Sequence, residues 1–245
     1  MTLRAKTEPE QLVLALPHRP AQEAEDFLVS RSNAAAVDLV DRWPGWPLPA
    51  ALVVGPAGAG KSHLANVWRL RSGALVAPAS RLDEAAVRAF EARPALVVED
   101  IDRGVGSEQV LFHLLNLARE KSGSILMTSR IAPGEIDITL PDLRSRLRAT
   151  PPVLIEMPDG PLIRSVLVKL FADRQLAVEP HVISYLALHM DRSMDAAIQV
   201  VAACDRLSLA MQRKVTRAVA AAALASVAAG DADDGPPGED AVAQD

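Results

Sequence analysis

The chain has 245 residues, 49% of them hydrophobic and 3% aromatic, which is enough to bury one substantial core and a small second domain. Its formal net charge of −5 arises at the C-terminal end, because six acidic and no basic residues follow Gly230; the rest of the chain carries +1. Such a near-neutral body implies no strongly basic face, so we expect no direct sequence-specific DNA binding. The one cysteine, Cys204, excludes an internal disulfide and a cysteine-based zinc site.

The two ends of the chain differ in composition from its centre. Residues 1–20 are polar and punctuated by prolines, which predicts a flexible arm, and the Gly-, Pro-, Ala- and Asp-rich tail over residues 230–245 is predicted to be disordered. The sequence contains neither a hydrophobic block typical of a signal peptide nor an apolar run as long as a membrane span. We therefore expect a cytoplasmic protein without a membrane partner.

A helix and a strand are predicted next. Ser32 and Asn33 fit the cap of a helix over residues 34–42. A proline-rich connection over residues 43–49 then leads into the apolar run 50–54, which is predicted to be a buried strand.

The most informative stretch runs from Gly55 to Ser62 and matches the phosphate-binding pattern G-x-x-x-x-G-K-[ST], the P-loop. It lies between the strand 50–54 and a helical start over residues 63–68, as its chemistry requires. Its glycines let consecutive N–H groups wrap a phosphate, and the helix N-terminus adds partial positive charge. The lysine would reach the β- and γ-phosphates, and the serine hydroxyl would ligate Mg²⁺. The sequence therefore predicts that ATP or ADP binds with Mg²⁺ to Gly55, Gly58, Gly60, Lys61, Ser62 and His63.

Downstream of the P-loop, short apolar runs alternate with amphipathic helical patterns. This alternation is typical of a parallel sheet that is covered by helices on both faces. The predicted strands cover residues 74–77, 95–98 and 124–128, and the predicted helices cover residues 83–91 and 107–121.

From Pro158 onward the pattern becomes purely helical. The predicted helices cover residues 160–173, 180–190, 193–209 and 214–229. We therefore predict an α/β nucleotide-binding domain over residues 21–157 and a small all-helical lid domain over residues 158–229. This arrangement resembles the layout of the AAA+ class of P-loop proteins.

Two carboxylates, Glu99 and Asp100, follow the predicted strand 95–98. In a P-loop fold an acid at this place completes the Mg²⁺ site, since the ion needs an oxygen ligand beyond the Ser62 hydroxyl. We assign Glu99 to the metal and Asp100 to the attacking water, whereas Asp102 suits a cap of the next helix. Because AAA+ proteins usually carry Asp and then Glu, the inverted order predicts slow hydrolysis.

Thr128 ends the next strand and would lie beside the γ-phosphate as a sensor, the alternative being a simple turn. In the AAA+ layout, residues 143–147 lie at a subunit boundary and can present an arginine to a neighbour's nucleotide. Such an arginine stabilises charge on the transferring phosphoryl group. We assign this finger role to Arg146 rather than Arg144; the alternative is that both are solvated helix residues.

Taken in order, the P-loop, the acid pair, the sensor strand, the Leu-Arg-Ser-Arg-Leu segment and the helical lid resemble the AAA+ region of the bacterial replication initiator DnaA over residues 20–228. No counterpart of DnaA's helix-turn-helix domain or of its helicase-interacting domain is recognised. The chain is therefore similar to the Hda family, the regulatory inactivators of DnaA. That resemblance implies a negative regulator of replication initiation, which holds nucleotide in its own P-loop and triggers ATP hydrolysis in DnaA through Arg146.

The resemblance also gives a role to the apolar island at residues 11–16. It matches the Q-L-x-L-x-L hexapeptide by which this family binds the DNA polymerase sliding clamp (its β subunit). An extended peptide presents such leucines at a period of two, with the glutamine amide as a polar anchor. A DNA-loaded clamp would then tether the chain and raise its effective concentration beside DnaA. The predicted clamp-binding residues are Gln11, Leu12, Leu14 and Leu16.

One position departs from the DnaA pattern. A sensor arginine begins the lid helix that corresponds to about residues 194–209, whereas this chain has Asp195 there and Arg192 as the nearest arginine. Either Arg192 contacts the nucleotide instead or sensing through the lid is altered, which leaves the preference for ADP or ATP open. Asn33, together with Ser32, is a candidate adenine contact that helix capping explains equally well.

Three other functions fit parts of the sequence. An autonomous DnaA-like or DnaC-like ATPase acting as a helicase loader predicts ATP turnover by the chain alone, or binding to single-stranded DNA; the near-neutral body and the hexapeptide count against it. A P-loop kinase leaves the helical C-terminal third unexplained. A nucleotide-dependent adaptor between clamp and initiator would not need Arg146. Whether the chain is itself an enzyme, and whether it self-associates, stays open at this level.

Overall fold

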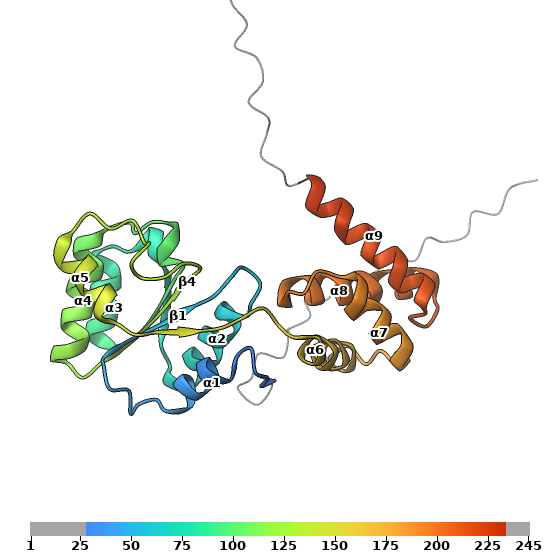
Figure 1. Ribbon diagram of the computed structural model, residues 1–245, viewed down its shortest axis with the longest axis horizontal. Helices are drawn as coiled ribbons and strands as arrows, with labels where there is room; N and C mark the ends of the chain where they lie inside the picture. Colours follow the sequence, from blue (N-terminus) through green and yellow to red (C-terminus); the bar gives the residue numbers. More distant parts are fainter. Residues whose placement is uncertain (1–27, 234–245) are drawn as a thin grey trace, which may run out of the picture.

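The computed structural model describes residues 28–233. The chain forms an α/β domain and then a group of helices, joined by one extended connection after the last strand (Figure 1). The predicted fold class is confirmed: an α/β P-loop domain with a parallel sheet, followed by a helical lid. No helix within residues 28–233 is long and apolar enough to cross a membrane.

One parallel sheet of five strands forms the centre of the α/β domain, in the order β2-β3-β4-β1-β5. Parallel neighbours need crossover connections, and helices supply them between successive strands. The strands are β1 (Ala50–Val54), β2 (Leu75–Pro78), β3 (Ala95–Glu99), β4 (Ser124–Ser129) and β5 (Pro152–Leu154).

Helices cover both faces of this sheet, with α1 and α2 on one face and α3, α4 and α5 on the other (Figure 1). Side chains that accept hydrogen bonds from backbone N–H groups fix two of the helix starts: Asp83 caps α3 and Ser107 caps α4. The helices are α1 (Ala34–Asp41), α2 (Lys61–Ser72), α3 (Glu84–Ala92), α4 (Glu108–Glu120) and α5 (Pro141–Ala149).

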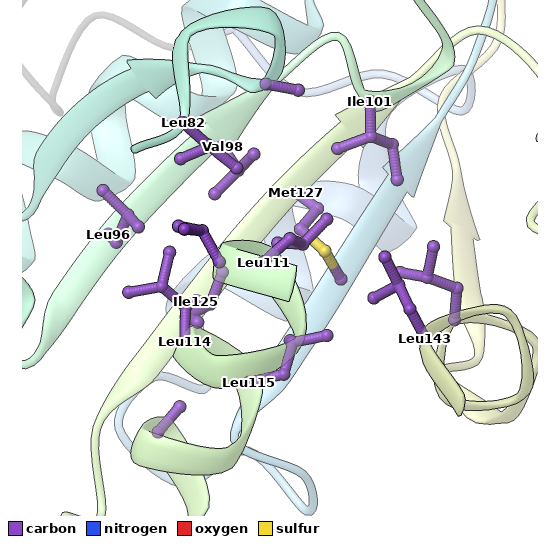
Figure 2. Close-up of a cluster of buried hydrophobic side chains, with 14 of the residues drawn as sticks. Leu82, Leu96, Val98, Ile101, Leu111, Leu114, Leu115, Ile125, Met127 and Leu143 are labelled. Atoms are coloured by element: carbon purple, nitrogen blue, oxygen red, sulfur yellow. The ribbon is translucent and has the colours of Figure 1, made fainter. Parts of the chain in front are cut away.

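The central strands send alternate side chains into two separate cores. On β3, Val98 packs with Leu111 and Leu114 of α4 in the core that Figure 2 shows. Its neighbour Val97 packs in the opposite core with Trp68 of α2. Since both faces are buried at the centre of the sheet, β1, β3 and the middle of β4 are apolar, and this explains why they were predictable as continuous apolar runs.

The lid has a hydrophobic core of its own. Cys204 is fully buried there, and burial, with a contribution from Asp205, raises the pKa of its thiol to about 11. It is a small core residue, as predicted. The lid helices are α6 (Gly160–Asp173), α7 (Pro180–His189), α8 (Met194–Met211) and α9 (Arg217–Asp233).

The end of the lid differs from the prediction. Helix α9 continues to Asp233, so the predicted boundary between the lid and the tail, at residue 230, lies within this helix. The run of alanines before this point favours helix strongly enough to carry it past Gly230. The rest of the predicted tail, residues 234–245, and the predicted arm, residues 1–20, lie outside the described residues.

Candidate functional site: a cavity between the P-loop and the lid

The P-loop connects β1 to α2 and depends on its glycines. A Cβ on Gly55 would lie 2.1 Å from the carbonyl oxygen of Ile155. Gly58 and Gly60 have φ angles of +72° and +101°, a region that residues with side chains rarely adopt. The loop therefore needs glycine at all three positions.

Lys61 is the first residue of α2, and only 7% of it is exposed. Its Nζ donates hydrogen bonds to the carbonyl oxygens of Gly55 and Pro56, at 2.7 and 2.8 Å. Burial lowers the pKa of Lys61, and the nearby carboxylates of Asp100 and Asp102 oppose that effect. The ammonium group is thus held inside the loop, directly before the N-terminal end of α2.

The lid meets the P-loop through the beginning of α8. The backbone N–H of Met194 donates to the carbonyl oxygen of Gly58 at 2.9 Å. Ser193 caps α8 and lies so close that a Cβ on Gly58 would come within 2.5 Å of its own Cβ. The contact brings the next residue of the helix, Asp195, to the cavity beside the P-loop.

A cavity of about 340 Å³ lies between the P-loop and the lid. Its wall is formed by residues of the P-loop, of the segments before α1, after β3 and after β4, and of α6 and α8. The lining residues are Leu28, Ala57, Gly58, Gly60, Lys61, Ser62, His63, Asp100, Arg103, Arg130, Val166, Lys169, Leu170, Asp173, Met194, Asp195 and Ile198.

The two predicted acids lie differently. Asp100 lines the cavity, while Glu99, the last residue of β3, is not among the lining residues. Asp100 has a φ of +57°, and the hydroxyl of Thr128 accepts a hydrogen bond from its N–H at 3.0 Å. Thr128 itself is 1% exposed and does not line the cavity. Its hydroxyl holds the backbone of Asp100 in its left-handed conformation at the end of β3.

Asp102 pairs with Arg130 and does not cap α4, so the prediction of a capping role was wrong: the hydroxyl of Ser107 accepts the hydrogen bond from Val110 instead. The Asp102 carboxylate, 3% exposed, accepts from the Nε of Arg130 at 2.7 Å and from its backbone N–H at 3.0 Å. Burial alone would raise the pKa of Asp102, but the hydrogen bonds from Arg130 outweigh it and the pKa is lowered. This ion pair holds Arg130 at the cavity.

The segment before α1 reaches the cavity through Leu28, and Asn33 fixes that segment. The Asn33 amide nitrogen donates to the Leu28 carbonyl at 2.9 Å, and its Oδ1 accepts from the Ser30 N–H at 2.8 Å. Neither Asn33 nor Ser32 lines the cavity. The Asn33 side chain makes no capping bond to α1 either, so it acts by placing Leu28.

The lid residues that reach the cavity were mostly missed. Val166 and Leu170 lie one turn apart on α6 and present one apolar face to it. Lys169 and Asp173 of the same helix form an ion pair of 3.2 Å at the cavity wall. In the sequence these residues fit an ordinary amphipathic helix, and no signal distinguishes a cavity wall from a core face. The predicted contact Arg192 is exposed and is not among the lining residues.

Arg146 lies on α5 and is not among the residues that line the cavity. Leu143 and Leu147, on either side of it, are fully buried and fix the helix to the domain. The Arg146 guanidinium lies over the ring of Phe112 of α4, with its central carbon 5.3 Å from the ring centroid. The chain therefore carries a partly exposed arginine apart from its own P-loop cavity.

The residues at the cavity fit a Mg²⁺ ion that binds together with a nucleotide, and not one held by protein ligands alone. Among residues 28–233, no group of three or more His, Cys, Asp or Glu side chains could hold a metal ion. Mg²⁺ beside a P-loop needs fewer protein ligands, because it keeps waters and binds phosphate oxygens. The Ser62 hydroxyl and the Asp100 carboxylate, both at the cavity, supply such oxygens. The predicted clamp-binding residues Gln11, Leu12, Leu14 and Leu16 lie outside the described residues.

The sheet order, the P-loop between β1 and α2 and the helical lid define the AAA+ fold, and solved structures share it. Domain III of the replication initiation protein DnaA from Thermotoga maritima matches with a TM-score of 0.73 and 18% identity, over 86% of this chain and 98% of that one. AMPPCP-bound DnaA from Aquifex aeolicus matches with a TM-score of 0.66 and 18% identity, over 88% and 71%. The Thermotoga maritima RuvB Holliday junction branch migration motor matches with a TM-score of 0.60 and 16% identity, over 78% and 65%.

The lid narrows the assignment within this class. Residues 163–219, which extend from α6 to the start of α9, match the family model described as the lid domain of Hda. This match identifies a Hda-type lid on a fold that the chain shares with domain III of DnaA.

Proposed function

We propose that this chain is a negative regulator of replication initiation, which binds nucleotide at its own P-loop and stimulates ATP hydrolysis by DnaA through Arg146. The observation that carries the proposal is the position of Arg146, which lies on α5, apart from the cavity lining of its own chain. An arginine placed in this way is suited to another molecule's site rather than to its own.

The cavity suits ADP or ATP. Its P-loop provides backbone N–H groups, the Lys61 ammonium and the start of α2, and all of these favour phosphate. Leu28, Val166 and Leu170 provide apolar surface for a base. Two of the structurally similar DnaA proteins are described as bound to AMPPCP, a triphosphate analogue, which supports this assignment.

Within this cavity, Ser62 and a carboxylate after β3 would ligate Mg²⁺. The geometry favours Asp100 for this role over Glu99, because Asp100 lines the cavity. Bound Mg²⁺ would neutralise phosphate charge. No second carboxylate from the end of β3 would then remain to orient the attacking water, so the chain would be a slow ATPase at most. This is in keeping with a protein that stimulates hydrolysis in its partner.

Arg146 would act in the nucleotide site of DnaA. A guanidinium supplied by another molecule stabilises the charge that develops on the transferring phosphoryl group, and this is worth about 10³–10⁵ in rate. Hydrolysis would convert ATP-bound DnaA to its ADP form and prevent a second round of initiation. The exposed, basic surface of α5, with Arg144 and Arg148 beside Arg146, would face the negatively charged site of the partner.

The sliding clamp would bring the two proteins together. The hexapeptide with Gln11, Leu12, Leu14 and Leu16 supports this part of the proposal from sequence alone. Two weak contacts that share one tether act as a strong one, because the local concentration reaches the millimolar range. The regulator would thus act in the cytoplasm, at clamps left on newly replicated DNA.

The test is the rate of phosphate release from ATP-bound DnaA as the concentration of this chain is raised, with and without DNA-loaded clamp. We expect Arg146→Ala to abolish stimulation at every concentration. Gln11→Ala should raise the concentration needed for half-maximal stimulation on loaded clamp and leave the maximum unchanged. Arg88→Ala, which removes an exposed arginine of α3 and leaves the α5 surface intact, is the matched control and should retain the stimulation.

Two results would overturn the proposal. Full stimulation by the Arg146→Ala variant would make the chain an adaptor. Vigorous ATP turnover by this chain alone, with no effect on DnaA, would favour the autonomous ATPase or helicase loader instead.

A further inference from the structure

Helix α5 begins without a cap of its own. Its N-cap residue, Leu140, has no side chain that can accept a hydrogen bond, and Pro141 follows it. Glu108, the first residue of α4 and 32 residues distant in sequence, instead binds the backbone N–H of the N-cap residue Leu140 itself.

Glu108 makes three hydrogen bonds to the segment that enters α5. Its Oε1 accepts from the Thr139 N–H at 2.9 Å, and its Oε2 accepts from the Thr139 hydroxyl at 2.9 Å and from the Leu140 N–H at 2.6 Å. Burial of the carboxyl would raise its pKa, but these hydrogen bonds, with the charge of Arg144, lower it. The carboxylate therefore fixes where α5 starts.

One turn further along α4, Phe112 contacts the side chain of Arg146. Residues at positions i and i+4 of a helix share a face, so Phe112 lies on the same side of α4 as Glu108. Its ring, partly exposed, carries the guanidinium of Arg146 at 5.3 Å. The same helix thus contacts both the beginning of α5 and the side chain of Arg146.

We infer that Glu108 and Phe112 of α4 are positioning residues for Arg146: Glu108 sets the start and direction of α5, and Phe112 holds the guanidinium over its ring, ready for a second protein's nucleotide. This inference rests on the proposed function and adds the residues that aim the arginine.

The physical reason is the flexibility of arginine. A long side chain must be ordered before it can stabilise a transition state, and every rotamer it loses beforehand lowers the cost at that moment. A ring face attracts a guanidinium without neutralising it, unlike a carboxylate. Phe112 can therefore order Arg146 while leaving its charge available.

The decisive variants change Phe112 and leave the apolar bulk in place. Phe112→Leu removes the ring face, and Phe112→Trp keeps it. In single-turnover hydrolysis by ATP-bound DnaA on loaded clamp, we expect Phe112→Leu to lower the rate at saturation about two- to fivefold. The concentration for half-saturation should stay within twofold, and Phe112→Trp should retain the wild-type rate.

Glu108→Gln tests the other contact. A glutamine replaces one of the two accepting oxygens with an NH₂ group, which cannot accept hydrogen bonds from the Thr139 and Leu140 donors. The start of α5 should therefore loosen, and the saturating rate should fall several-fold. Glu120→Gln is the matched control, since it makes the same charge change on an exposed residue at the far end of the same helix. It should leave the rate unchanged.

A second readout needs no partner. In a chain labelled with ¹⁵N-arginine, the Nε–H proton of Arg146, assigned by its loss in Arg146→Ala, should move downfield in Phe112→Leu because the ring current above the Phe112 face is lost. Circular dichroism and the melting temperature establish that each variant is folded.

The inference fails if Phe112→Leu stimulates like the wild type although Arg146→Ala does not stimulate at all, or if it changes only the half-saturating concentration, as a residue of the docking surface would. It also fails if the Arg146 resonance does not move in the folded variant. If Arg146→Ala itself stimulates normally, the proposed function is what fails, so the two outcomes are distinguishable.

Discussion

The P-loop cavity and the α5 face use positive charge in opposite ways. In the cavity, cations are matched by carboxylates of the same chain: Arg130 pairs with Asp102 at 2.7 Å, and Lys61 lies in the field of Asp100. On α5, Arg146 lies over the ring of Phe112, and within residues 28–233 no carboxylate forms an ion pair with it. A cation that pairs with a carboxylate of its own chain is already neutralised. A cation that contacts only an aromatic ring remains available to bind an anion of another molecule.

The sharpest way to separate the two regions is the variant Lys61→Ala. Loss of a buried ammonium that would contact phosphate should weaken nucleotide binding about 100-fold. Arg146→Ala should leave the same affinity within twofold, because Arg146 does not line the cavity. Titration with a fluorescent ADP analogue measures both. Equal losses of affinity in the two variants would mean that Arg146 serves the nucleotide site of its own chain.

The contact between P-loop and lid is tested by Gly58→Ala. The substitution strains a φ of +72° and also drives a Cβ to within 2.5 Å of the Ser193 Cβ, so it should destabilise the fold by about 2–3 kcal/mol. Gly73→Ala is the control, because Gly73 has a similar φ of +68° and its nearest atom would lie 3.7 Å away. It should cost about 1 kcal/mol. Urea unfolding measures the free energy of unfolding of both variants. Equal losses would mean that the lid moves away from the P-loop without cost and that its contact with Gly58 adds no stability.

The ion pair of the cavity gives the smallest effect, in Asp102→Asn. The folded state lowers the pKa of Asp102 below its usual 3.8, so the carboxylate adds stability above that value and loses it as the pH falls through the lowered pKa. We expect the variant to be about 1–2 kcal/mol less stable at neutral pH, and the gap to close in strongly acidic solution. Urea unfolding at several pH values measures it. A gap that does not change with pH would contradict the charge-based account.

Much of the fold was predictable because its signals are local. The P-loop pattern gives the link between β1 and α2, and continuous apolar runs give the buried strands β3 and β4 within a residue or two. Helix α6 starts and ends where its periodicity predicts. Strand β5, with three residues at the sheet edge, is too short to produce a pattern and was not predicted.

The site was harder to predict because its members meet only through tertiary contacts. Sequence order cannot tell that Thr128 supports the backbone of Asp100, or that Asp102 binds Arg130, which follows the neighbouring strand β4. Successive residues of a strand point to opposite faces of the sheet. In addition, the left-handed φ of Asp100 changes the direction of the chain directly after β3. For this reason we assigned both acids to the site from the sequence, Glu99 to the metal and Asp100 to the attacking water, whereas only Asp100 lines the cavity.

The proposed function requires that Arg146 acts in another protein's nucleotide site. The decisive measurement is single-turnover phosphate release from ATP-bound DnaA on loaded clamp, with the Arg146→Ala chain at saturation. We predict a rate about 10³-fold or more below that with the wild-type chain, at unchanged binding to the clamp. A rate within a few-fold of the wild type would contradict the claim and leave the α5 face with a docking role alone.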